Sequence, residues 1–192
     1  MSDKRINVLQ LYPKDMNIYG DWGNALVIKR RLEWHGYQPQ LIDYNPGDAF
    51  PKDIDIILGG GGQDSGQDVI QNDLLSIGAE LHRHADSDTP MLMICGLYQL
   101  FGKFFKTRDG HIIEGISIFD AETHAGNERL IGNITTKSTR FGEIIGYENH
   151  SGQTFLGKTT LPLGRVMKGA GNNGQDDTEG AQYRNVIASY MH

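Results

Sequence analysis

Short apolar runs alternate with longer amphipathic stretches through the first half of the chain. Residues 6–12 (INVLQLY) alternate apolar and polar side chains, which is the pattern of a strand with one buried face. Residues 23–35 carry apolar side chains on one helical face and charged ones on the other, and Gly36 follows as a typical helix end. Residues 40–44 predict a second strand, and the nearly all-apolar residues 55–58 predict a third that is buried on both faces.

The same alternation continues further along the chain and then stops. Residues 67–84 predict a second helix after the glycines at 59–62, and residues 91–94 predict another buried strand. Strands that alternate with helices indicate a parallel sheet covered by helices on both faces. From Gly115 onward, short β-like runs are separated by glycine-bearing turns, and we expect them to extend the same sheet as partly antiparallel strands. The pattern therefore predicts an α/β fold in which residues 1–192 form one domain.

Composition excludes several classes of protein. The 192 residues include 18 basic and 24 acidic side chains, a net charge of −6, and no basic cluster that could neutralise a run of phosphates. No apolar run approaches the roughly 18–20 residues of a membrane-spanning helix, and the N-terminal residues lack the apolar core of a signal peptide. The single cysteine cannot form an internal disulfide, which is typical of a reducing compartment. We therefore expect a cytoplasmic protein without a membrane span or a nucleic-acid partner.

Cys95 is the strongest candidate for a reactive side chain. It follows the predicted strand at residues 91–94, Gly96 comes next, and a helix-compatible segment begins after it. A tight strand-to-helix turn exposes a nucleophile, and the helix N-terminus directs backbone N–H groups at a thiolate or an oxyanion. The alternative is a small buried hydrophobic residue, which is the commonest environment of a lone cysteine.

The glycines at 59–62 lie at the carboxyl end of a neighbouring strand, where ligands bind in open α/β sheets. Such a run allows close backbone approach and offers N–H groups to a substrate or an oxyanion. Neither the P-loop pattern nor the dinucleotide-binding glycine pattern is present. A plain flexible turn is the alternative.

A cysteine nucleophile needs a base, and the chain has seven histidines. His150 lies in a polar segment and is one candidate. His192 follows a β-like run, which places its imidazole at a strand end. We expect no metal site, because the zinc-binding pattern H-E-x-x-H and a second cysteine are both absent.

The chain resembles triad-type (class I) glutamine amidotransferases of the cobyric-acid-synthase-like branch. Residues 94–99 (ICGLYQ) match the nucleophile motif C-G-x-Y-Q of that branch. Other matching segments are YGDWGN at 19–24, GGGQD at 60–64, NERL at 127–130, GYENH at 146–150, GNN at 171–173 and YMH at 190–192. The resemblance spans nearly the whole chain. It implies a flavodoxin-like, three-layer fold with a mainly parallel central sheet and extra antiparallel strands in the C-terminal half.

The resemblance also implies the roles of particular residues. Cys95 would be the nucleophile, and His192 its general base and then its general acid. Arg129 would hold the substrate, since a planar guanidinium can bind a carboxylate through two hydrogen bonds. As an isolated sequence feature, an arginine such as Arg129 is more often a surface charge.

The backbone N–H of Gly96 and that of Gly61 are expected to hold the tetrahedral oxyanion. Gly62, Gln63 and Gln99 complete the expected substrate-binding set.

One element of the family pattern is missing. Many class I amidotransferases place a glutamate two residues after the histidine, and nothing follows His192 here. Asp21 lies after the first predicted strand and is the best substitute for it. The same residue also suits an N-cap of the helix at 23–35. Members of this branch continue past the matching histidine, so we expect residues 1–192 to be shorter than the family at the C-terminus and to turn over weakly.

The resemblance implies hydrolysis of L-glutamine to glutamate and ammonia. It is strongest to glutaminase subunits that pass ammonia to a MurT-like Mur-ligase partner, which amidates the D-glutamate α-carboxyl of lipid II in peptidoglycan synthesis. ATP and Mg²⁺ would act in that partner, and no cofactor is expected in this chain. The alternatives are an amidotransferase for another acceptor such as a corrinoid, a different cysteine hydrolase on the same fold, and a binding subunit with a structural Cys95.

Overall fold

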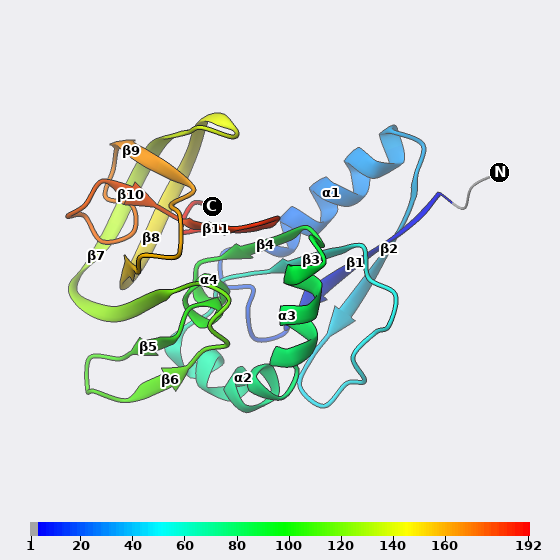
Figure 1. The fold of residues 1–192 in the computed structure, drawn as a ribbon, viewed down its shortest axis with the longest axis horizontal. Coiled ribbons are helices and arrows are strands. Elements are labelled where there is room, and N and C mark those ends of the chain that lie inside the picture. The colour runs from blue at the N-terminus through cyan, green and yellow to red at the C-terminus, as the bar shows by residue number, and fades with distance from the viewer. Residues whose placement is uncertain (1–3) are drawn as a thin grey trace.

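Two six-stranded β-sheets organise residues 4–192, the part of the chain that the computed structural model describes (Figure 1). The first sheet contains β1 (Arg5–Leu11), β2 (Gln38–Tyr44), β3 (Ile56–Gly59), β4 (Met91–Ile94), β11 (Ala181–Tyr183) and β12 (Val186–Ser189). The second contains β5 (Phe104–Lys106), β6 (Ile112–Glu114), β7 (Ala121–Ser138), β8 (Gly142–Leu156), β9 (Gly164–Lys168) and β10 (Thr178–Glu179). The helices are α1 (Trp22–Trp34), α2 (Asp64–Ser76), α3 (Gly78–Asp86) and α4 (Gly96–Phe101).

The first sheet has the order β11-β12-β4-β3-β1-β2. All its neighbouring pairs are parallel except β11 with β12. This arrangement confirms the predicted parallel sheet. It also brings β12 directly beside β4, so the ends of two strands far apart in sequence meet at one edge.

Helices cover both faces of this sheet, as the alternating pattern of β1 requires. Leu9 and Leu11 pack in the main core with side chains of α2 and α3, such as Ile70. Val8 points to the opposite face and packs with Ala25 of α1. Successive side chains of a strand point to opposite faces, so one strand supplies both cores. Figure 1 shows α1 on one side of the sheet and α2 and α3 on the other.

The helix predicted over residues 67–84 is two helices, α2 and α3, separated at Ile77. Gly78 begins the second helix close to Ile116, where a Cβ atom would lie 3.3 Å from the isoleucine Cγ2. The apolar period continues across this break, which is why the pattern alone predicts one helix.

The expectation that the C-terminal strands extend the first sheet is wrong for most of them. Only β11 and β12 join it, and the long hairpin of β7 and β8 forms the second sheet with β5, β6, β9 and β10. Several of the glycines that suggested turns, including Gly126, Gly146 and Gly152, lie inside the strands of this hairpin instead. At Gly152, a Cβ atom would overlap the Gln99 amide and lie 3.2 Å from the Tyr190 hydroxyl, so glycine allows close packing against the first sheet.

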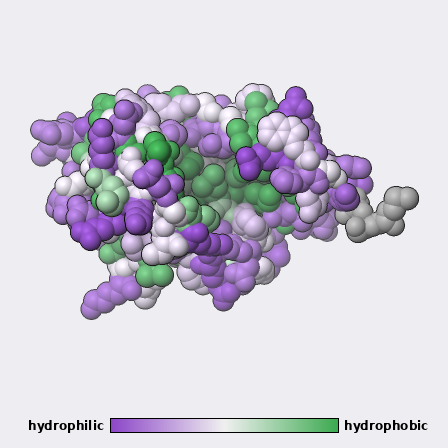
Figure 2. All heavy atoms as spheres, turned by 90° about the horizontal axis from the view of Figure 1, so that it is seen from above, coloured by the Kyte–Doolittle hydropathy of each residue, from purple (hydrophilic) through white to green (hydrophobic). Residues whose placement is uncertain are grey.

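The surface is hydrophilic at both ends of the molecule when it is seen from above (Figure 2). Hydrophobic side chains gather in the hollowed middle of that face. Among the helices of residues 4–192, none is long and apolar enough to cross a membrane.

Candidate active site

Cys95 occupies the turn between β4 and α4, as the sequence predicts. Its φ of +51° and ψ of −103° lie in a region that residues other than glycine rarely adopt. The turn is held by a hydrogen bond from the Cys95 N–H to the Ser189 carbonyl of β12 (2.9 Å). A strained backbone that is fixed in this way is typical of a strand-to-helix turn that presents a nucleophile.

Cys95 is 6% exposed, so its thiol is largely shielded from water. Burial raises the pKa of its thiol to about 12, and the negative charge of Asp21 adds to the rise. The Arg129 guanidinium and the Gly96 N–H act in the opposite direction without compensating for burial. Burial of the thiol therefore opposes the expected preference for thiolate at the N-terminus of the short helix α4.

The glycine loop that follows β3 contacts Cys95, but not in the expected way. The Gly61 N–H donates to Oδ2 of Asp21 (3.0 Å), so this amide is not available to an oxyanion. The expectation that Gly61 is the oxyanion donor is wrong on this geometry. The N–H groups of Gly62 and Gly96 remain as candidate oxyanion donors, and the Gly96 N–H already acts on the Cys95 sulfur, where it lowers the pKa of the thiol. They are adjacent, because a Cβ atom on Gly96 would lie 2.8 Å from the Gly62 nitrogen.

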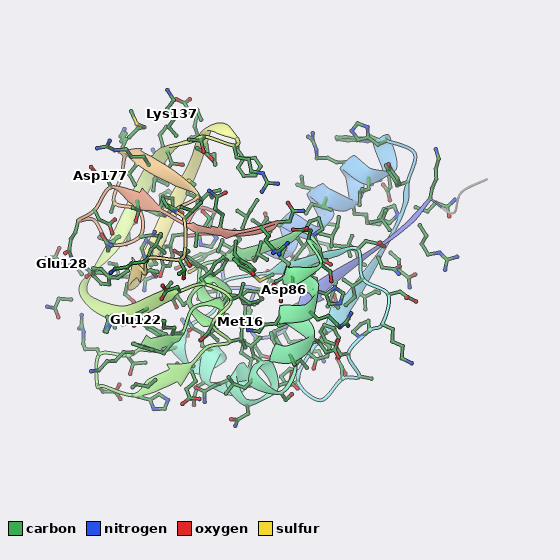
Figure 3. The ribbon with its side chains drawn as sticks, viewed as in Figure 1. Met16, Asp86, Glu122, Glu128, Lys137 and Asp177 are labelled. Carbon is green, nitrogen blue, oxygen red and sulfur yellow. The ribbon has the colours of Figure 1, made fainter. Side chains whose placement is uncertain are left out.

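Met16 packs against this glycine loop. Its side chain is fully buried. A Cβ atom on Gly62 would overlap this side chain, and a Cβ atom on Gly96 would lie 2.6 Å from it. Figure 3 shows Met16 in the middle of the molecule, whereas Glu128 and Lys137 lie at the periphery of the second sheet. The loop and the Cys95 turn are therefore packed on one buried side chain, which requires glycine at both positions.

His192 lies beside Asp21, the residue expected to substitute for the missing glutamate. Nδ1 of its ring is 3.3 Å from Oδ1 of the carboxylate, and the two side chains are only 14% and 3% exposed. Asp21 does not cap α1 with its side chain within residues 4–192; Oδ1 of Asn17 accepts the Trp22 N–H instead (2.9 Å). The carboxylate is thereby free to orient the histidine.

Arg129 lies in a β-bulge of the second sheet. Residues 126–129 of β7 stand opposite the single residue Ser151 of β8, since the register shifts between Ala125 and Leu130. The guanidinium of Arg108 holds this bulge by donating to the carbonyls of Gly126 (3.0 Å) and Asn127 (2.7 Å). Bulges re-aim side chains, and this one brings Arg129 into the cavity that Cys95 lines.

Most of the Arg129 guanidinium is already bonded to protein. Nε and Nη2 both donate to Oδ1 of Asn149 (3.1 and 2.9 Å), and Nη2 also donates to the Tyr19 hydroxyl (3.0 Å). Nη1 has no acceptor in the part of the chain described here. Of the guanidinium nitrogens expected to bind a substrate carboxylate, only Nη1 is therefore available in this state.

His150, the other candidate base, faces protein groups through both ring nitrogens. Nδ1 hydrogen-bonds the Gly152 carbonyl (2.7 Å), and Nε2 lies 3.9 Å from the Glu148 carboxylate. The ring stacks on Tyr190 with centroids 3.6 Å apart. The side chain is buried, and it lines the cavity that Cys95 also lines, whereas His192 is not among the lining residues.

A cavity of about 600 Å³ opens at Cys95 between the two sheets. It is large enough to hold a small amino acid. The predicted residues that line it are Gly62, Gln63, Cys95, Gln99 and Arg129. The lining residues that sequence reasoning missed include Ile18, Tyr19, Gln67, Asn149 and Ser151.

Gln99 supports the floor of this cavity. Its Oε1 accepts from Nε2 of Gln67 (2.8 Å), and its Nε2 donates to the Tyr190 hydroxyl (3.1 Å). Within residues 4–192, no group of three or more His, Cys, Asp or Glu side chains is arranged to hold a metal ion.

A parallel sheet with a cysteine turn, a histidine at the end of the neighbouring strand and an adjoining second sheet defines the class I glutamine amidotransferase fold. The solved structure of PurLQS from Thermotoga maritima superposes with a TM-score of 0.70 at 14% identity, covering 97% of this chain and 87% of that one. Residues 7–192 match the family of CobB/CobQ-like glutamine amidotransferase domains. The chain belongs to this family.

Two curated relatives are similar along nearly the whole chain. The lipid II isoglutaminyl synthase (glutamine-hydrolyzing) subunit GatD of Staphylococcus aureus (strain N315) is 36% identical, over 92% of this chain and 72% of its own length. The subunit of the same name from Streptococcus pneumoniae (strain ATCC BAA-255 / R6) is 37% identical, over 98% of this chain and 74% of its own length.

Proposed function

We propose that this chain is the glutaminase subunit of a lipid II isoglutaminyl synthase. It would hydrolyse L-glutamine and supply ammonia to a MurT-like Mur-ligase partner, which amidates the α-carboxyl of D-glutamate in lipid II. The observation that carries the proposal is the strained Cys95 turn facing a 600 Å³ cavity that also contains Arg129. The similarity to the two GatD subunits supports the choice of acceptor.

The first step is formation of a thioester. Nδ1 of His192 faces Asp21, which leaves Nε2 to take the proton of the Cys95 thiol. The sulfur then attacks the side-chain carbonyl carbon of glutamine. Because burial raises the pKa of the resting thiol to about 12, the attack requires a base to remove its proton.

The tetrahedral intermediate then collapses. The adjacent N–H groups of Gly62 and Gly96 would donate to its oxyanion. His192 returns its proton to the leaving nitrogen, the C–N bond breaks and ammonia departs. Water next attacks the γ-glutamyl thioester with the same histidine as base, which gives glutamate and restores the thiol.

Arg129 would bind the α-carboxylate of glutamine through Nη1. The hydrogen bonds of Nε and Nη2 to Asn149 and Tyr19 fix the position of the guanidinium in the cavity. ATP and Mg²⁺ belong to the reaction of the ligase partner, and the chemistry of this chain requires no cofactor. We also propose that this subunit acts in the cytoplasm.

The glutamine analogue 6-diazo-5-oxonorleucine tests the chemistry. Its reaction with the wild-type chain should add a stable mass to Cys95, and glutamate release should disappear in Cys95→Ser. Absence of labelling, even with the co-expressed ligase partner, would refute the glutaminase assignment. Glutamine-dependent amidation of lipid II by the co-purified pair tests the acceptor. Glutamine hydrolysis that supports amidation of a corrinoid instead would refute the acceptor while retaining the chemistry.

A further inference from the structure

Tyr19 contacts both His192 and Arg129 in the candidate site. Its ring packs edge-on against the His192 imidazole, with centroids 4.7 Å apart and planes at 66°. Its hydroxyl accepts a hydrogen bond from Nη2 of Arg129 (3.0 Å) and donates one to the Asn149 carbonyl (3.3 Å). One side chain therefore links the general base with the group that would hold the substrate carboxylate.

The backbone on either side of Tyr19 is fixed to the glycine loop. The Ile18 N–H donates to the Gly61 carbonyl (3.1 Å), and the Asp21 carboxylate accepts from the Gly61 N–H (3.0 Å). Gly20, between them, has a φ of +78°, which lets the chain turn so that Tyr19 and Asp21 reach the same histidine. The position of Tyr19 is thus set by the loop that also flanks Cys95.

The contacts of His192 divide between two residues of this segment. Asp21 meets the ring at Nδ1, while Tyr19 contacts the ring as a whole. The contact with the Asp21 carboxylate restrains one nitrogen but leaves the ring free to rotate about that contact. An aromatic neighbour restricts this rotation, because edge-to-face packing has a preferred geometry.

We propose that Tyr19 is a positioning residue whose ring orients His192 and whose hydroxyl holds Arg129 in the substrate cavity. The inference rests on the proposed glutaminase function. The ring acts on the proton-transfer step and so on kcat. The hydroxyl acts on substrate binding and so on KM. Tyr19 itself makes and breaks no bond to the substrate.

The division of labour predicts different kinetics for two substitutions. Tyr19→Phe keeps the ring and removes the hydroxyl, so KM for glutamine should rise about tenfold while kcat stays within twofold. Tyr19→Leu removes both, so kcat should also fall, by about 3–10-fold. The pH profile of kcat/KM should shift on the limb governed by His192 only in Tyr19→Leu, because only that variant changes the surroundings of the ring.

Tyr37 provides the matched control. It is 43% exposed against 40% for Tyr19, and it lies in the connection between α1 and β2. Tyr37→Phe and Tyr37→Leu should leave kcat, KM and the pH profile unchanged. The assays would use the full chain, alone and with the co-expressed Mur-ligase-like partner, and thermal melts would confirm folding.

The outcomes separate this inference from the proposed function. Glutamine hydrolysis by the wild type, with both Tyr19 variants within twofold of it, would overturn the role of Tyr19 alone. An equal loss of kcat in Tyr19→Phe and Tyr19→Leu would overturn the division between ring and hydroxyl. If Tyr19→Leu does not fold, Tyr19→Phe still decides the matter, because an unchanged KM overturns the proposal. A wild type that neither hydrolyses glutamine nor reacts with 6-diazo-5-oxonorleucine would overturn both.

Discussion

The carboxylate of Asp21 joins the base of the candidate site to the loop beside its nucleophile. Oδ1 lies 3.3 Å from Nδ1 of His192, and Oδ2 accepts the Gly61 N–H at 3.0 Å. A Cβ atom on Gly61 would lie 3.5 Å from the Cys95 sulfur and 3.6 Å from the same Oδ2, so the carboxylate is also close to the thiol. Asp21 therefore orients one catalytic group and makes the other harder to ionise.

Asp21→Asn should change these two properties in opposite directions. Loss of the negative charge removes one cause of the raised Cys95 pKa, so the thiol should ionise at lower pH than in the wild type. Iodoacetamide should then alkylate Cys95 faster at a given pH between 8 and 10. Glutaminase kcat should fall by about 10²-fold or more, because His192 loses its charged partner.

Asp64→Asn is the control for the alkylation measurement. Asp64 lines the same cavity, but it is not among the groups that shift the Cys95 pKa. Its substitution should leave the pH dependence of alkylation unchanged. An equal acceleration in both variants would show that a general change in cavity charge, and not Asp21, sets the reactivity of the thiol.

Arg129→Ala should raise KM for glutamine by about 10–100-fold, the range expected when a hydrogen bond to a charged group is lost. The fold should survive, because the bulge is held by Arg108 and not by Arg129. Steady-state kinetics with a thermal melt would test both statements. Arg140→Ala, at the far end of the β7–β8 hairpin, is the control. An unchanged kcat/KM in Arg129→Ala would mean that Arg129 only supports Asn149 and Tyr19.

Gly62→Ala should remove activity by displacing an oxyanion donor. A Cβ atom there would overlap the Met16 sulfur and lie 3.0 Å from the Asp15 carbonyl, so the loop must move. Loss of one oxyanion donor costs about 10²–10³ in kcat. Gly23→Ala in α1 is the control, because a Cβ atom there meets nothing within 4 Å and alanine favours the helix. Wild-type kcat in Gly62→Ala would exclude Gly62 as a donor.

The periodicity of the first half was enough to predict most of the first sheet. The strand at residues 91–94 and the turn at Cys95 followed directly from it, because buried parallel strands have a distinct apolar signature. The second sheet was not predictable in the same way. Glycine is ambiguous in a sequence, since it marks turns and also close approaches such as that of Gly152 to Gln99.

The residues of the candidate site were also only partly predictable from the sequence. Cys95 and His192 follow the neighbouring strands β4 and β12, so the order of the strands places both at one edge of the sheet. Asp21 comes well after the end of β1, and the intervening loop brings it to His192. Tyr19 and Asn149 were missed, although both lie in segments that matched the family. Their roles depend on a contact between residues 130 positions apart, which no local spacing reveals. The engagement of the Gly61 N–H by Asp21 is likewise a tertiary hydrogen bond.

Glu179 provides a prediction about stability. This residue is fully buried. Its Oε1 accepts hydrogen bonds from the Ser189 hydroxyl (2.7 Å) and the Tyr190 N–H (2.8 Å). Its Oε2 has no hydrogen-bond partner among residues 4–192. Burial raises the pKa of this carboxyl, so the folded chain binds the proton more tightly than the unfolded chain does. Its contribution to stability is therefore complete below the unfolded pKa and is lost as pH rises through the folded pKa. Urea unfolding from pH 4 to 8 should show Glu179→Gln gaining stability relative to the wild type as pH rises, with exposed Glu143→Gln as control. A difference that is constant across this range would mean that Glu179 ionises equally in the two states.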